Sequence, residues 1–152
     1  HVVGAGGPNL GDNARDNLVP KTFLALNQGR NPQVYGTNYQ TKDGTCIRDY
    51  IHVSDLADAH ILAMEKMGTT PESKVFNVGS GTGYSVFEMM EQMKDSTGIN
   101  FQVDLMEPRA GDPSVLIADV TKIERELGWK PKRNLKEMID SAWSAEKAGA
   151  AK

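Results

Sequence analysis

The segment GTCIRDYIHVSDLADAH, residues 44–60, constrains the fold most, because a strand pattern runs directly into a helix pattern there. Side chains in a strand alternate between two faces. One face carries an acid among apolar residues and can join a core: Ile47, Asp49, Ile51 and Val53. The other face is a row of polar or polarisable side chains: Cys46, Arg48, Tyr50 and His52. The Ser54–Asp55 pair that follows is a good start for a helix. The segment therefore predicts a strand-to-helix unit.

Strand patterns alternate with helix patterns along the rest of the chain as well. Strands are predicted at 32–36, 74–80 and 100–106, and helices near 18–28, 54–67, 86–96, 120–127 and 135–147. Ser85 and Glu88 form a capping box for the third helix, and Asn134 caps the last one. The alternation indicates the α/β class. One helix, 54–67, has a mostly apolar stripe expected to face a core: Leu56, Ala59, Ile61, Leu62, Met64 and Met67.

Length and composition limit the classes of function. A chain of 152 residues is enough for one ordinary domain. Its formal net charge of −3 argues against a nucleic-acid surface built on bulk positive charge, but it allows a phosphate held by one or two arginines. The single cysteine, Cys46, suits a reducing cytoplasm. Because no secretory signal and no apolar run of about 20 residues is visible, we expect a cytoplasmic protein without a membrane partner.

One glycine motif invites comparison with a dinucleotide-binding loop. The segment VGSGTGYS, residues 78–85, follows a predicted strand and opens a helix. The G-x-G-x-x-G fingerprint needs glycines at offsets 0, 2 and 5. Counting from Gly79 puts Tyr84 at the last position, and counting from Gly81 puts Val86 there. We therefore interpret the motif as a flexible strand-to-helix turn without a cofactor.

Two arginines are candidates for holding a phosphate. Arg48 projects from the polar row of its strand, and Arg109 sits in a Pro/Gly-framed loop three residues before Asp112. A guanidinium matches phosphate oxygens with two parallel hydrogen bonds and stays charged at any working pH. The alternative is a pair of structural salt bridges, for example Arg48 with Asp49 or Asp55. Spacing alone favours that alternative.

The sequence contains no recognisable pattern of metal ligands and no recognisable set of catalytic residues. His52 and His60 lie near carboxylates, but nothing has metal-ligand spacing. Cys46 lacks an activating partner and is interpreted as a small apolar residue. The methionines of the second and third helices are interpreted as core residues: Met64, Met67, Met89, Met90 and Met93.

Several segments together resemble one enzyme family. TKDGTCIRDYIHVSDLADAHILAMEK is similar to the signature of the UDP-glucose 4-epimerases (UDP-galactose 4-epimerases), which are extended short-chain dehydrogenases/reductases. The likeness continues in the family's order through DNLVP, VYGTNYQTKDGT, VFNVGSGTGYSV, PRAGDP and ADVTKIERELGWKPKRNLKEMI. It covers nearly the whole chain. DGTxxRDYIHVxDLAxAH is highly specific, whereas GSGTGYS and RELGW are shared more widely by sugar-nucleotide epimerases and dehydratases.

The resemblance implies that residues 1–152 are the UDP-sugar-binding C-terminal region of such an enzyme. In the family, an N-terminal Rossmann half binds NAD and supplies a Y-x-x-x-K catalytic pair. The tyrosines of this chain all lack a lysine four residues on: Tyr35, Tyr39, Tyr50 and Tyr84. We therefore expect no catalytic and no cofactor-binding residue here. The implied fold is an α/β substrate-binding lobe whose strands complete or abut a missing Rossmann sheet.

The resemblance also implies a uridine site. Asn17 and Leu18 are similar to the family's Asn-Leu pair at the diphosphate and uridine. Gln33, Val34 and Tyr35 resemble the short strand that binds uracil through its backbone while an aromatic ring packs nearby.

The remaining implied substrate contacts surround the phosphates and the sugar. Arg48 resembles the diphosphate arginine, with Tyr50 beside it. Arg109 and Asp112 resemble the arginine and the acid that close over the phosphates and ribose. Leu116 aligns with a position whose size gates access for N-acetylated sugars.

The implied activity is that of an isomerase of galactose metabolism, which interconverts UDP-galactose and UDP-glucose through a 4-keto intermediate with NAD. This chain supplies the anchor for UDP, and alone it is expected to be inactive. Two alternatives stay open: part of a sister nucleotide-sugar epimerase or dehydratase, or a non-catalytic nucleotide-sugar-binding module. We expect the full-length protein to be a homodimer that binds a UDP-sugar and no nucleic acid.

Overall fold

Short strands and longer helices alternate along the chain. The computed structural model describes residues 1–14, 16–68 and 73–150, and within these ranges it contains seven strands and five helices. The strands are β1 (Val2–Val3), β2 (Gln33–Tyr35), β3 (Ile47–Asp49), β4 (Ile51–His52), β5 (Gly83–Ser85), β6 (Asp104–Met106) and β7 (Val115–Leu116). The helices are α1 (Leu18–Asn27), α2 (Val53–Met67), α3 (Val86–Thr97), α4 (Thr121–Leu127) and α5 (Leu135–Ala150). The predicted α/β class is confirmed.

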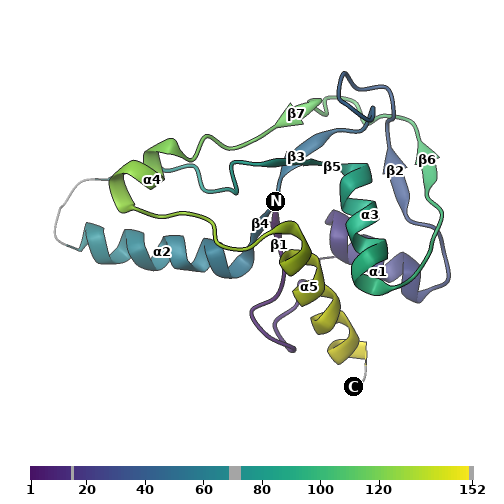
Figure 1. The fold of residues 1–152 in the computed structure, drawn as a ribbon, viewed down its shortest axis with the longest axis horizontal. Coiled ribbons are helices and arrows are strands. Elements are labelled where there is room, and N and C mark those ends of the chain that lie inside the picture. The colour runs from purple at the N-terminus through teal and green to yellow at the C-terminus, as the bar shows by residue number, and fades with distance from the viewer. Residues whose placement is uncertain (15, 69–72, 151–152) are drawn as a thin grey trace.

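The strands form three small sheets. β1 pairs in parallel with β4, β2 pairs in parallel with β6, and β3 lies between antiparallel β5 and parallel β7. In this last sheet Arg48 is opposite Tyr84 on one side and Leu116 on the other. Figure 1 shows the three-stranded sheet in the middle of an elongated molecule, with β2 and β6 toward one end and α2 and α4 toward the other. The segment from β3 through β4 into α2 therefore connects the two ends.

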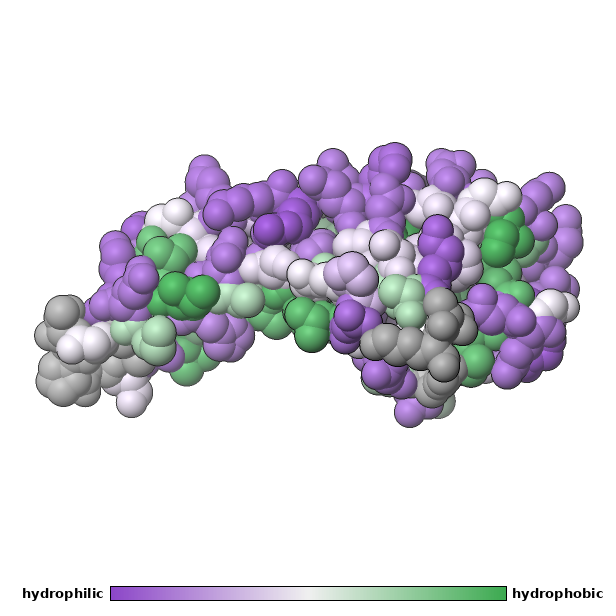
Figure 2. Space-filling model, turned by 90° about the horizontal axis from the view of Figure 1, so that it is seen from below, coloured by the Kyte–Doolittle hydropathy of each residue, from purple (hydrophilic) through white to green (hydrophobic). Residues whose placement is uncertain are grey.

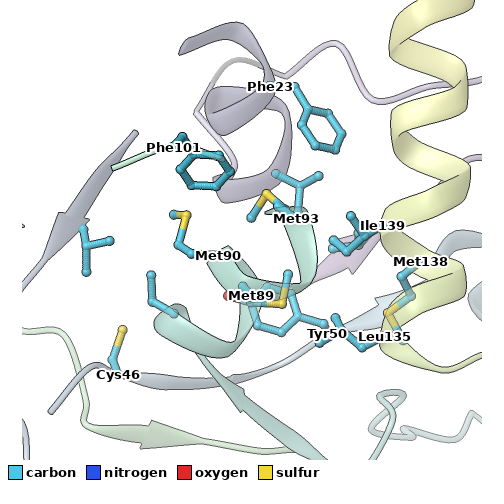
Figure 3. Packing of buried hydrophobic residues seen from close by; sticks show 14 residues of the cluster. Phe23, Cys46, Tyr50, Met89, Met90, Met93, Phe101, Leu135, Met138 and Ile139 are labelled. Atoms are coloured by element: carbon cyan, nitrogen blue, oxygen red, sulfur yellow. The ribbon is translucent and has the colours of Figure 1, made fainter. Parts of the chain in front are cut away.

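The larger hydrophobic cluster lies where α1, α3 and α5 meet. Met93 of α3 points toward Phe23 of α1 and Ile139 of α5, as Figure 3 shows. Tyr50 belongs to the same cluster and lies beside Met89. Fully burying a side chain of this size contributes about 1.5–3 kcal/mol relative to leaving it exposed. This cluster therefore holds the three helices against the strand that carries Arg48.

A smaller cluster packs α2 against α4 and the turn that follows it. Its buried members are Ile51, Ala59, Ile123, Leu127 and Trp129. The fully buried Asp55 of α2 accepts from the backbone N–H groups of Lys132 and Arg133, at 3.0 Å each, and pairs with the Arg133 guanidinium. The Trp129 indole donates to the carbonyl oxygen of Asp55 at 3.1 Å. These bonds tie the segment before α5 to α2.

Part of the predicted α2 stripe does not reach a core. Ala59 is 2% exposed, but Ile61 is 49% and Met64 is 70% exposed. The prediction that Ile61 and Met64 face a core is therefore wrong, because α4 covers only one side of α2. Figure 2 shows apolar side chains left on the surface over this end of the molecule. The predicted core side chain of Met67 lies outside the described residues.

The predicted strand at 74–80 is also wrong. Residues 73–80 form no ladder, although Phe76 and Val78 pack against the smaller cluster. The apolar alternation there is satisfied by packing, without a hydrogen-bonded neighbouring strand. The strand predicted at 100–106 is confined to β6. Two of the three predicted helix starts are confirmed: Ser85 and Glu88 form a reciprocal capping box, and Asn134 and Glu137 do the same before α5. The remaining helix start differs, because α2 begins at Val53 and is capped by His52 instead of by the Ser54–Asp55 pair.

His52 joins three parts of the fold. It is 4% exposed, and its Nδ1 accepts from the backbone N–H of Ser54 at 3.0 Å, which caps α2. Its Nε2 lies 3.0 Å from Oγ of Ser141 on α5, and that hydroxyl also accepts from the N–H of Ala5 after β1. Because Nδ1 is an acceptor, the ring is neutral and Nε2–H is the donor.

We expect unfolding free energy to fall as the pH drops below about 6.5. Burial and then the Arg133 guanidinium lower the pKa of His52 from its ordinary 6.5, against the opposing effects of Asp55 and Glu137. The unfolded chain therefore takes up a proton at a higher pH than the folded one, so His52 favours folding fully above pH 6.5 and less as the pH falls toward its lowered pKa. Urea unfolding at pH 7.5 and pH 5.5 measures this difference, and His52→Gln should reduce it. An undiminished difference in the variant would assign it to other groups.

Candidate functional site

Arg48 is the centre of the candidate site. It lies on the middle strand of the central sheet, and its side chain is only 9% exposed. Nη1 donates to the carbonyl oxygens of Ile47 and Pro113 at 2.9 and 2.7 Å. Nη2 lies 3.5 Å from Oδ1 of Asp112. The guanidinium thus ties the loop 107–114 to the sheet through two carbonyl oxygens and the Asp112 carboxylate.

Arg48 does form a structural salt bridge, as the alternative interpretation expected, but not with either of the acids named for it. The acid beside it is Asp112, and neither Asp49 nor Asp55 forms an ion pair with it in the described ranges. Asp112 is itself half-buried. Arg48, which was predicted to bind a phosphate, and Asp112, which was predicted to accept from a ribose hydroxyl, therefore already lie side by side in the folded chain.

A second cationic cluster surrounds Tyr35 at the end of β2. The Cζ atom of Arg109 lies 4.1 Å from the centroid of the Tyr35 ring, and Nζ of Lys21 on α1 lies 5.5 Å from it. The Tyr35 hydroxyl donates to Oε1 of Gln33 at 2.8 Å. The pairing of β2 with β6 brings the loop after β6 over this strand. Arg109 and Tyr35, predicted as separate contacts, are thus brought together.

A groove of about 370 Å³ runs between α1 and β2. Leu18, Lys21 and Gln33 line it, so two predicted uridine contacts share one surface. The whole of Val34 is buried, so Gln33 and Tyr35 are the residues of β2 that are exposed or partly exposed to a ligand. Asn17 does not line this groove. It borders a separate hollow of about 380 Å³ toward α5.

The predicted sugar contact, Leu116, and the predicted neighbour of the diphosphate arginine, Tyr50, do not line the uridine groove. Leu116 is 58% exposed and borders a hollow of about 490 Å³ together with His1 and Asp49. Tyr50 is 3% exposed, and its ring lies 5.3 Å from the ring of His1. Burial raises the pKa of the Tyr50 hydroxyl, which therefore stays protonated. The predicted row of polar or polarisable side chains at residues 46–52 is thus buried along its length, and Cys46 and Tyr50 belong to the core.

Asp49 is a site residue that the sequence reasoning missed. Its carboxylate accepts from the N–H and the hydroxyl of Ser80 at 2.7 Å each, from the N–H of Gly81 at 3.0 Å and from the N–H of Ala118 at 3.1 Å. A Cβ on Gly79 would lie 2.5 Å from this carboxylate. The glycine motif therefore encloses an acid of its own chain. The signal was present in the sequence, as an acid placed on the apolar face of a strand.

This arrangement bears directly on a dinucleotide cofactor. A glycine loop binds a pyrophosphate through free backbone N–H groups. Here the N–H groups of Ser80 and Gly81 already bind Asp49. The motif does not fit a dinucleotide, in agreement with its failed spacing.

The Arg48–Asp112 pair and the cationic cluster around Tyr35 together suit an anionic ligand with an aromatic part. Arg48, Arg109 and Lys21 supply positive charge, Tyr35 offers a ring, and Asp112 accepts from hydroxyl groups. Within the described ranges, no group of three or more His, Cys, Asp or Glu side chains is placed to hold a metal ion. No helix in the same ranges is long and apolar enough to cross a membrane.

Comparisons with known proteins agree with this chemistry. Residues 5–142 match the sequence family described as GDP-mannose 4,6 dehydratase. A UDP-glucose 4-epimerase of Lactobacillus helveticus is 47% identical over 133 residues, which cover 86% of this chain and 40% of that protein. A solved UDP-glucose 4-epimerase of Stenotrophomonas maltophila, with bound NAD and formylated UDP-arabinopyranose, superposes with a TM-score of 0.92 at 34% identity. It is matched over 99% of this chain and 46% of its own.

A third relative has a broader substrate name. The UDP-Glc/GlcNAc 4-epimerase of Campylobacter jejuni superposes with a TM-score of 0.77 at 39% identity, over 96% of this chain and 46% of its own. The chain thus spans less than half the length of the relatives that it matches. The predicted fold, an α/β lobe of an extended short-chain dehydrogenase/reductase, is confirmed.

Proposed function

We propose that this chain, which belongs to the GDP-mannose 4,6 dehydratase family, is the substrate-binding C-terminal region of a UDP-glucose 4-epimerase. It resembles UDP-glucose 4-epimerases and related nucleotide-sugar epimerases in sequence and in fold. The observation that carries the proposal is the cationic cluster around Tyr35, formed by Arg109 and Lys21 beside the uridine groove, together with the Arg48–Asp112 pair on the central sheet.

In this proposal the chain anchors the nucleotide and leaves the sugar free to turn. Backbone groups of β2 hold uracil beside Tyr35, Arg48 and Arg109 hold the diphosphate, and Asp112 accepts from a ribose hydroxyl. Binding energy from these non-reacting parts of the substrate becomes positioning of the reacting carbon. NAD, held by an N-terminal half outside residues 1–152, would accept and return the hydride at C4 of the hexose.

Two alternative functions are compatible with the same site. A sister epimerase or dehydratase would use the same anchor with another sugar, and the likeness to the Campylobacter jejuni enzyme favours this as the second candidate. A non-catalytic nucleotide-sugar-binding module would bind UDP without any partner half. The proposed function and its two alternatives differ in activity and in substrate, so assays on a single chimaeric protein can distinguish them.

A chimaera tests the proposal. Residues 1–152 replace the matching segment of the Lactobacillus helveticus enzyme, and the conversion of UDP-galactose to UDP-glucose is measured. We expect turnover by the chimaera and none by residues 1–152 alone with added NAD, because the glycine motif at 78–85 already binds Asp49 and does not fit a dinucleotide. A folded chimaera that binds NAD but converts no UDP-hexose would refute the proposal. Size-exclusion chromatography of the same chimaera tests the proposed homodimer.

We expect the chimaera to prefer UDP-glucose and UDP-galactose over their N-acetylated forms. Leu116 is intermediate in size between tyrosine and cysteine and borders the sugar-side hollow. Leu116→Cys should therefore raise the relative turnover of UDP-N-acetylglucosamine, and Leu116→Tyr should lower it. The ratio of kcat/KM values for the two sugars measures the effect. Equal turnover of both sugars before any substitution would contradict the assignment.

A further inference from the structure

Lys21 stands out among the basic residues near the candidate site. It lies in the first turns of α1, lines the uridine groove, and places Nζ 5.5 Å from the Tyr35 ring centroid. Nothing in the proposed set of substrate contacts uses it. Its side chain lines the groove together with Leu18 and Gln33, and its ammonium lies over the ring of Tyr35, beside the proposed nucleotide.

The charges around this ring do not balance. Arg109 stacks on Tyr35 from the loop after β6. In the described part of the chain, no carboxylate lies within ion-pair distance of Lys21 or Arg109, whereas Arg48 has Asp112 at 3.5 Å. Two cations beside one ring repel each other, and the whole chain is acidic with a net charge of −3. Such a local excess of positive charge is the electrostatic setting that attracts an anion.

The stacking on Tyr35 does not by itself account for Lys21. A cation over an exposed aromatic ring contributes only about 0.5–1 kcal/mol. Lys147 makes a similar contact with Trp143, at 5.8 Å, and neither of these residues lines the uridine groove. The difference at Lys21 is that the groove and the second cation are present as well.

We propose that Lys21 binds the 5′ phosphate of the nucleotide, the phosphate nearest the base, and so forms a third cationic contact beside Arg109 and Arg48. This inference rests on the proposed function, because it takes the ligand to be a uridine nucleotide. Lys21 and Arg109 both lie over the ring of Tyr35, so the 5′ phosphate of a base bound beside this ring would be close to two cations. The residue therefore contributes affinity for the charged part of the ligand and not for the base.

Titrations of the 152-residue chain with uridine, UMP and UDP test this assignment. Lys21→Met should weaken the binding of UMP and of UDP by about tenfold each, which corresponds to about 1.4 kcal/mol, and leave uridine binding unchanged. Lys21→Arg should restore most of the loss. Lys147→Met is the matched control, since it removes a lysine with a similar ring contact away from the groove. Circular dichroism and the unfolding midpoint verify that each variant is folded.

The outcomes separate this inference from the proposed function. Unchanged UMP affinity in Lys21→Met, with UDP binding lost in Arg48→Ala, overturns the role of Lys21 and leaves the proposed function standing. An equal loss for uridine overturns the phosphate assignment, because the contact would then be to the base or ribose. Failure of the unsubstituted chain to bind either UMP or UDP overturns the proposed function and this inference with it.

Discussion

Replacing Arg48 by alanine is expected to weaken UDP binding by about 100-fold, or about 2.7 kcal/mol. The guanidinium is buried and already holds the loop 107–114 through Pro113 and Asp112. Its removal takes away the charge that would meet the diphosphate and leaves Asp112 without its ion-pair partner. Isothermal titration with UDP measures the loss, and turnover of the chimaera should fall with it.

Arg48→Lys separates the phosphate contact from the structural one. Lysine keeps the positive charge but lacks the planar fork that reaches two acceptors at once. We expect it to lose most of the contact with the carbonyl oxygens of Ile47 and Pro113, yet to retain part of the UDP affinity. Equal UDP affinity in the unsubstituted chain and in Arg48→Ala would remove Arg48 from the binding site.

The helices were predictable because their signals are local. Capping boxes at Ser85 and Asn134 involve residues three apart, so the pattern of letters already specifies the hydrogen bonds. The failure at Met64 has the opposite cause. Its spacing predicts an apolar helix face, but only the position of α4 decides which part of that face is covered.

The candidate site depended on the resemblance rather than on spacing. Tyr35 and Arg109 are 74 residues apart, and no periodicity in the sequence indicates that β6 pairs with β2 and carries the arginine over the ring. The motifs that resemble the epimerase family indicated both residues as separate substrate contacts, and only the folded chain shows that they meet. Lys21 and Asp49 were missed because neither belongs to the family contacts carried over, and only the folded chain shows their partners.

Asp49→Ala is expected to lower the free energy of unfolding by about 3 kcal/mol or more. The substitution removes an acceptor shared by the N–H groups of Ser80, Gly81 and Ala118, together with the hydroxyl of Ser80. Each buried donor left without a partner costs about 1–3 kcal/mol, and water that enters the half-buried site recovers part of this. Urea unfolding of the 152-residue chain measures the change. A loss below about 0.5 kcal/mol would show that the carboxylate does not hold the loop.

Two further variants test whether the Asp49 carboxylate holds the glycine loop. Asp49→Asn keeps the shape but turns an amide NH₂ toward backbone donors, so it should cost nearly as much as alanine. Gly79→Ala leaves the carboxylate intact and places a Cβ 2.5 Å from it and 2.7 Å from the Cβ of Ala118, so one of them must move. Asp58→Asn is the matched control, since that acid pairs with Lys132 at the surface and should change stability by less than about 1 kcal/mol. If Asp49 positions the loop that borders the sugar-side hollow, Gly79→Ala will also change the relative turnover of N-acetylated and plain UDP-hexoses in the chimaera, whereas Asp58→Asn will not.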